Sequence, residues 1–207
     1  HTTLRRQRQM CIRDSLIYLI LVILVATGFT YISYKIYPSI GFVKNDIWRV
    51  LPSPGDANRD IYTRAFVSQY GTFALAKPEA AYFSASIDIE ENLLSGNCSY
   101  KLTGEDIEAK WWAITLYDKD GFLTQNNEKL YSFNSENIDF SFEGGFEIYF
   151  TNDDTFIAEL NNKNWLRSPV EENFSISMRI YLPGEEFFSN LKRINLPIVE
   201  KIRCLDE

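Results

Sequence analysis

The side chains available for chemistry in this chain are carboxylates, lysines, arginines and aromatic rings. Its single histidine is His1, so the body of the chain has no histidine for a catalytic triad, a metal site or acid–base work. The sequence also has no phosphate-binding loop, no dinucleotide fingerprint, no G-x-S-x-G and no H-E-x-x-H. An enzyme built on it would use Asp, Glu, Tyr, Lys or Arg, and we expect neither a metal nor a cofactor.

Aromatic and polar side chains form two candidate binding groups. An aromatic platform for a sugar or an apolar ligand would consist of Trp111, Trp112 and Tyr117. A polar pocket would be lined by Asn164, Trp165, Arg167, Arg179 and Tyr181. Core packing is the competing interpretation of the first group, and a solvated strand face is that of the second.

Two pairs of aspartates are interpreted as turns. Asp118 and Asp120 precede Gly121, but the spacing and the distal Glu of a calcium loop are missing. Asp153 and Asp154 also read as a turn.

The cysteines indicate whether the domain lies in an oxidising compartment, where disulfides persist. Cys98 and Cys204 are a candidate disulfide pair, while Cys11 lies near the start of the chain. Two unrelated buried thiols are the alternative. A disulfide here would close a loop of about a hundred residues and hold the C-terminus, stabilising the fold by about 4–5 kcal/mol.

The pattern of the remainder predicts a mainly β protein. Alternating apolar residues indicate strands near residues 82–89, 97–102, 110–117, 138–142, 146–150 and 174–181. A short helix is expected over residues 60–70, with Ile61, Ala65 and Phe66 on one face, and a helical turn over residues 185–191. Short, evenly spaced strands favour an antiparallel β-sandwich of jelly-roll type with one or two short helices.

An uncharged run from Ser15 to Tyr34 precedes this domain, and twenty helical residues rise about 30 Å, the thickness of a bilayer core. We expect a transmembrane helix over residues 15–36, a juxtamembrane linker over residues 37–55 and the β-sandwich domain over residues 56–207. A cleaved signal peptide and a buried helix are the alternatives. Residues 6–15 resemble a translated sequencing-adaptor tail, so residues 1–14 are interpreted as a non-native leader.

The charge of the chain limits its partners. From Pro38 onward, 16 Lys and Arg stand against 27 Asp and Glu. Such an acidic domain does not attract nucleic acid.

Several stretches occur in an order that resembles one protein family. They are DANRDIYTRAFVSQYGTFAL, EAAYFSASID, LLSGNCSYKLTG, AKWWAITLYDKDGFL, NWLRSP, NFSISMRIYLPG and LPIVEKIRC. Together they resemble the bacterial domain of unknown function 1214 family, in its short, singly membrane-anchored form. The resemblance implies a β-sandwich-like domain without an established reaction, and it implies that Cys98 pairs with Cys204. The family often has Pro where this chain has Arg167.

We therefore expect a membrane-anchored cell-envelope protein of the bacterial inner membrane. It would pass the bilayer once, through residues 15–36, and present a periplasmic β-domain that binds an envelope protein or a small-molecule ligand. The alternative is a His-free hydrolase or lyase that uses paired carboxylates on a glycan-like substrate. Two carboxylates in a deep cleft would favour the enzyme, and a shallow aromatic groove would favour binding.

Overall fold

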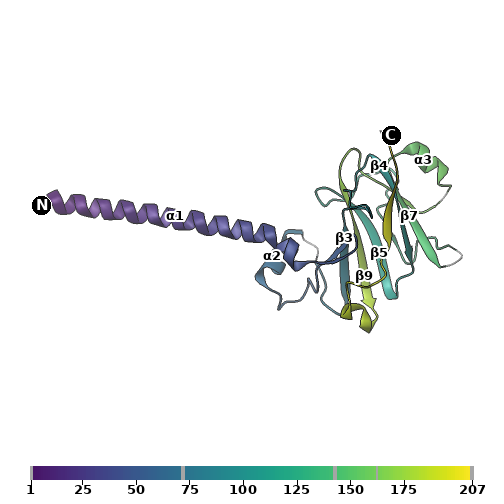
Figure 1. Cartoon of the computed structure of the whole chain (residues 1–207), viewed down its shortest axis with the longest axis horizontal. Coiled ribbons are helices and arrows are strands. Elements are labelled where there is room, and N and C mark those ends of the chain that lie inside the picture. Colours follow the sequence, from purple (N-terminus) through teal and green to yellow (C-terminus); the bar gives the residue numbers. More distant parts are fainter. Residues whose placement is uncertain (1, 71–72, 142–143, 162, 206–207) are drawn as a thin grey trace. The chain divides into compact units, whose positions relative to one another are not determined.

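The computed structural model describes residues 2–70, 73–141, 144–161 and 163–205. The chain divides into two units, residues 1–41 and residues 42–207. The first contains helix α1 (Thr2–Gly41). The second contains the strands and the remaining helices (Figure 1).

Helix α1 includes a stretch from Cys11 to Tyr37 that is long and apolar enough to cross a membrane. Two threonines within it hydrogen-bond to the helix backbone. The Thr27 hydroxyl donates to the carbonyl of Ile23 (2.9 Å), and that of Thr30 donates to the carbonyl of Ala26 (2.8 Å). Internal bonds of this kind are what a helix needs where no water is present.

The second unit is a β-sandwich, as the sequence predicts. One sheet has six antiparallel strands in the order β1-β2-β3-β9-β5-β6 and is called sheet 1. Its strands are β1 (Val43–Asn45), β2 (Trp48–Val50), β3 (Ala80–Ala85), β9 (Phe174–Pro183), β5 (Ala109–Asp118) and β6 (Ser132–Asn134).

The other sheet, sheet 2, has four strands in the order β10-β4-β7-β8. They are β10 (Ile198–Cys204), β4 (Cys98–Glu105), β7 (Gly145–Thr151) and β8 (Trp165–Arg167). The β7–β8 pair is parallel, an exception to the expected antiparallel pattern. Three helical segments connect strands, namely α2 (Ile61–Tyr70), α3 (Asp154–Glu159) and the 3-10 turn η1 (Glu185–Ser189).

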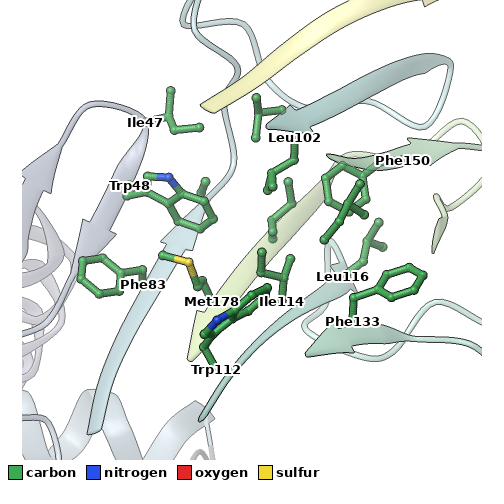
Figure 2. Packing of buried hydrophobic residues seen from close by; sticks show 14 of the residues in the cluster. Ile47, Trp48, Phe83, Leu102, Trp112, Ile114, Leu116, Phe133, Phe150 and Met178 are labelled. Atoms are coloured by element: carbon green, nitrogen blue, oxygen red, sulfur yellow. The ribbon is translucent and has the colours of Figure 1, made fainter. Parts of the chain in front are cut away.

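The core lies between the sheets. Trp112 of sheet 1 stacks on Phe146 of sheet 2 with ring centroids 4.9 Å apart, and Phe174 of sheet 1 contacts Phe150 of sheet 2 at 6.3 Å. Figure 2 shows Trp112 among other buried side chains, including Met178. Trp112 is fully buried, so for this residue the competing interpretation, core packing, holds and it is not part of a ligand platform. Successive side chains of a strand point to opposite faces, so Trp112 points into the core and its neighbour Trp111 points away from it.

The disulfide is present. Cys98 of β4 and Cys204 of β10 lie directly opposite each other in the antiparallel register and are joined by their sulfurs. Beyond it, the amide of Leu205 donates to the carbonyl of Asn97 (2.8 Å). The C-terminal strand is therefore held to the sheet by a covalent bond as well as by its ladder.

Several segments differ from the sequence expectation. Part of the expected linker, residues 43–50, forms β1 and β2, and Trp48 is buried with its indole N–H donating to the carbonyl of Pro197 (2.7 Å). In the expected strand over residues 138–142, an isolated bridge joins Phe140 to Phe146, and residue 142 lies outside the described residues.

The two aspartate pairs behave differently. Asp118 and Gly121 form the expected turn, in which the amide of Gly121 donates to the carbonyl of Asp118 (3.1 Å). Asp153 instead caps helix α3, because its carboxylate accepts from the amides of Thr155 (2.9 Å) and Phe156 (3.2 Å).

Candidate functional site

The alternation of β9 decides which of its side chains can meet a ligand. Phe174, Ile176, Met178 and Ile180 are buried in the core. Successive side chains in a strand point to opposite faces, so Arg179 and Tyr181 project from the outer face of sheet 1. The neighbouring strands supply their partners on this face, since Tyr181 pairs with Trp111 of β5 and Arg179 pairs with Tyr82 of β3.

Three aromatic rings form a continuous row across these strands. The rings of Trp111 and Tyr181 lie 5.4 Å apart at a tilt of 56°, and those of Tyr181 and Tyr82 lie 6.4 Å apart edge to face. Each of the three side chains is half-buried, so part of each ring faces solvent. We call Tyr82, Tyr181 and Trp111 the aromatic row. Figure 1 shows its strands β3, β9 and β5 side by side.

Arg179 brings a positive charge beside the aromatic row. Its guanidinium lies over the ring of Tyr117, 5.7 Å from the centroid, and one nitrogen donates to the Tyr117 hydroxyl. A guanidinium has five N–H donors, so others remain for a ligand. Four of the eight candidate binding residues thus lie on this one face, namely Trp111, Tyr117, Arg179 and Tyr181.

Tyr82 joins the row although the sequence did not single it out. Its hydroxyl accepts a hydrogen bond from the amide of Leu75 (2.8 Å), and burial raises the pKa of this phenol. It therefore stays a neutral hydroxyl at physiological pH. The place of Tyr82 in the row follows from the register of β3 against β9, and the sequence pattern of β3 alone does not show it.

The other predicted residues lie on the opposite side of the sandwich. Leu166 of β8 is buried in the core, so Trp165 and Arg167 project from the outer face of sheet 2. The expected single pocket, formed with Arg179 and Tyr181, is therefore divided between two faces. Strand β8 joins a different sheet from β9, which the spacing in the sequence does not reveal.

Asn164 serves the fold in this structure. It is buried, and its side-chain amide donates to the carbonyls of Asp139 (3.0 Å) and Glu147 (2.9 Å). Its side-chain oxygen accepts from the amide of Asp139 (2.9 Å). These three bonds hold the segment before β7 against the start of β8.

Arg167 is already paired. Its guanidinium contacts Glu128 (2.8 Å) and Asp154 (2.9 Å) and lies 5.6 Å from the centroid of the Trp165 ring. Hydrogen bonding to this arginine lowers the pKa of Glu128, and the same bond raises the pKa of Arg167. The guanidinium therefore links the loop before β6 to α3 and β8.

A second polar group lies on the outer face of sheet 2. The Tyr149 hydroxyl donates to Glu147 (2.7 Å) and accepts from the Lys163 ammonium (3.3 Å), while Lys101 lies 3.7 Å from Glu147. Burial, with a further contribution from Glu147, raises the pKa of Tyr149 to about 12. A phenol held in its neutral form is not suited to act as a nucleophile or a base near neutral pH.

A pocket of about 500 Å³ opens beside the start of β5. It has an apolar part formed by Ile107, Phe187 and Ile194. Four carboxylates also line it, those of Glu105, Asp106, Glu108 and Glu186.

These four acidic residues are exposed to solvent. Asp106 accepts from the indole N–H of Trp112 (3.0 Å), and Glu105 accepts from the side-chain amide of Asn195 (3.1 Å). Among the residues that the structure describes, no group of three or more His, Cys, Asp or Glu is placed to hold a metal ion.

The fold has relatives among solved structures. The VPA0106 protein from Vibrio parahaemolyticus superposes with a TM-score of 0.58 at 19% identity, over 70% of this chain and 36% of that one. An uncharacterised protein from Burkholderia cenocepacia gives a TM-score of 0.43 at 16% identity, over 86% of this chain and 42% of that one. The chain thus spans less than half of either protein, and the first likeness supports the fold alone.

No curated protein matches the sequence. The model of a family described as "Protein of unknown function (DUF1214)" matches residues 79–185. This segment holds β3, β5 and β9, the strands that carry the aromatic row, and it covers more than half of the chain. The protein therefore belongs to the DUF1214 family.

Proposed function

We propose that this is a single-pass membrane protein whose β-sandwich binds a carbohydrate on the outer face of sheet 1. The aromatic row, with Arg179 beside it, is the observation that carries the proposal. Three partly exposed rings in mutual contact on a face turned away from the core form an extended apolar surface.

The chemistry of this face favours a sugar. Sugar rings present C–H groups on their faces and hydroxyls at their edges, so they pack on Trp and Tyr rings while their edges need hydrogen bonds. Arg179 and the hydroxyls of Tyr117 and Tyr181 supply polar groups beside the rings. The positive charge of Arg179 also favours a sugar that bears a carboxylate or a phosphate.

The disulfide supports a location outside the cytoplasm, because disulfides persist in oxidising compartments. With α1 as an anchor, we place the sandwich on the periplasmic side of a bacterial inner membrane. The ligand would then be an envelope glycan.

The experiment measures binding of the full chain, in a mild non-ionic detergent, to immobilised peptidoglycan fragments, lipopolysaccharide cores and acidic polysaccharides. Trp111→Ala and Tyr181→Ala should each weaken binding about tenfold, or about 1.4 kcal/mol. Trp165→Ala is the matched control, because Trp165 also lies beside an arginine but on the other sheet. Its affinity should equal that of the wild type.

Two results would overturn the proposal. One is the absence of binding to every glycan on the array. The other is binding that survives Trp111→Ala but is lost in Trp165→Ala, which would move the site to sheet 2.

The pocket with four carboxylates favours a second candidate, a hydrolase or lyase that acts on a glycan. Glu108 and Glu186 line it and have no side-chain hydrogen bond to another described residue. Glycosidases use two carboxylates, one of which must be protonated to act as the acid. All four carboxylates here are exposed to solvent, so we rank this candidate second. Cleavage of a polysaccharide that is abolished in Glu108→Gln would reverse the ranking.

A further inference from the structure

Helix α2 and the loop after it leave large apolar side chains in solvent. Ile61 is 76% exposed, Phe73 is 95% exposed and Leu75 is 41% exposed. Of the three residues expected on one face of this helix, Ile61 and Ala65 are exposed and Phe66 is half-buried. We call Ile61, Phe73 and Leu75 the α2 surface.

The α2 surface is held firmly by the fold. Asp60 caps the helix, since its carboxylate accepts from the amides of Tyr62 and Thr63, each at 3.0 Å. The backbone at Gly55 touches the backbone at Ala74 so closely that a Cβ on Gly55 would lie 1.9 Å from the Ala74 carbonyl oxygen. The start of α2 and the backbone at Ala74 are therefore both held by close contacts within the fold.

Two more hydrogen bonds attach the loop to the sandwich. The amide of Lys77 donates to the Ser53 hydroxyl (3.1 Å), and the amide of Leu75 donates to the Tyr82 hydroxyl (2.8 Å). The second bond places Leu75 next to Tyr82, at the edge of the aromatic row.

The length of the chain keeps this surface close to the membrane. The apolar stretch of α1 ends at Tyr37, and Phe42 follows five residues later. Five residues span at most about 18 Å even when fully extended. The ring of Phe42 contacts that of Phe66 in α2, with centroids 5.3 Å apart. Helix α2 thus cannot move far from the bilayer that holds α1.

We propose that the α2 surface inserts into the interfacial region of the same bilayer. This inference rests on the membrane anchor of the proposed function, but it does not depend on carbohydrate binding. Apolar side chains enter the boundary between headgroups and acyl chains, while neighbouring basic residues contact phosphates. Arg59 and Arg64 flank Ile61 and provide such charges. Docking would fix the orientation of the sandwich and place the aromatic row beside the membrane.

The test places a fluorescent label at single sites in the full chain, reconstituted in vesicles of phosphatidylcholine and phosphatidylglycerol. The free thiol is removed by Cys11→Ser, and the label is attached to Phe73→Cys. Phe122→Cys is the matched control, because Phe122 is also an exposed phenylalanine, 70% exposed, at the end of β5. Lys44→Cys controls for proximity alone, since this exposed residue lies two positions after Phe42.

Lipids with a nitroxide just below the headgroup should quench the label at position 73 at least about twofold more than either control label, because interfacial side chains lie about 5–10 Å deep. Ile61→Ser combined with Leu75→Ser should reduce that quenching without changing the unfolding midpoint of the domain.

Equal quenching at positions 73 and 44, or no quenching at 73, would overturn the proposal. A chain that does not co-sediment with the vesicles would refute the anchor itself and the proposal with it. If the label at position 73 is quenched as expected but the chain binds no glycan, the result contradicts the proposed function alone.

Discussion

Asn164 provides the sharpest test of the fold around the candidate residues. The sequence suggests a binding role for it, but the structure shows a buried amide with three hydrogen bonds to the backbone. Replacing it with alanine leaves one amide and two carbonyl groups without their partners. At about 1 kcal/mol for each lost bond, Asn164→Ala should destabilise the domain by about 3 kcal/mol.

Urea unfolding of the full chain in detergent measures this loss. All four tryptophans lie between residues 48 and 165, so their fluorescence reports on the sandwich and not on α1. Asn127→Ala is the matched control, because Asn127 is exposed, and it should change stability by less than about 0.5 kcal/mol.

Asn164→Asp separates hydrogen bonding from packing. The aspartate has the same shape but lacks the two N–H donors, so its carboxylate would face the carbonyl oxygens of Asp139 and Glu147. We expect it to be at least as destabilising as alanine. A stability close to that of the wild type, or a loss below about 1 kcal/mol for alanine, would refute the reasoning.

Three further predictions concern stability, each measured by the same fluorescence assay. Replacing Cys98 and Cys204 with serine should lower stability by about 4–5 kcal/mol, because it opens a loop of 106 residues, and an unchanged midpoint would contradict this. The pKa of Tyr149 is raised from 10.0 to about 12, so its neutral phenol contributes stability that is intact below pH 10 and is lost as the pH rises through 12. Between pH 9 and pH 12 the free energy of unfolding should therefore fall by about 2 kcal/mol less in Tyr149→Phe than in the wild type. Gly55→Ala should destabilise by about 1–3 kcal/mol, since its Cβ would overlap the backbone of Ala74, and a neutral effect would show that this loop yields.

Local patterns predict the long strands well. The alternation of β9 identifies its core side, and heavy side chains on both faces of β5 indicate a strand with neighbours on each side. Burial on one face of β9 and partial exposure on the other follow directly from the period of two.

The assignment of strands to sheets is not encoded in that period. Trp165 and Arg167 lie near β9 in sequence, yet β8 pairs with β7 in the other sheet. For the same reason, the role of Tyr82 emerges only from the register between β3 and β9. Helix α3 is too short to show a helical period in the sequence, so the sequence pattern assigns Asp153 to a turn although it caps this helix.

The strand order has a consequence for how the protein is made. Strand β9 lies between β3 and β5 in sheet 1, and β10 forms an edge of sheet 2. Neither sheet is therefore complete until residues 174–204 have been made. While residues 174–204 are still being synthesised, β3 and β5 each have an unpaired edge. Pairing between segments so distant in sequence is slow, and open edges invite association with other chains. The incomplete domain is therefore prone to associate with other chains until β9 and β10 are made, and truncation before β9 should yield aggregation instead of a smaller folded domain.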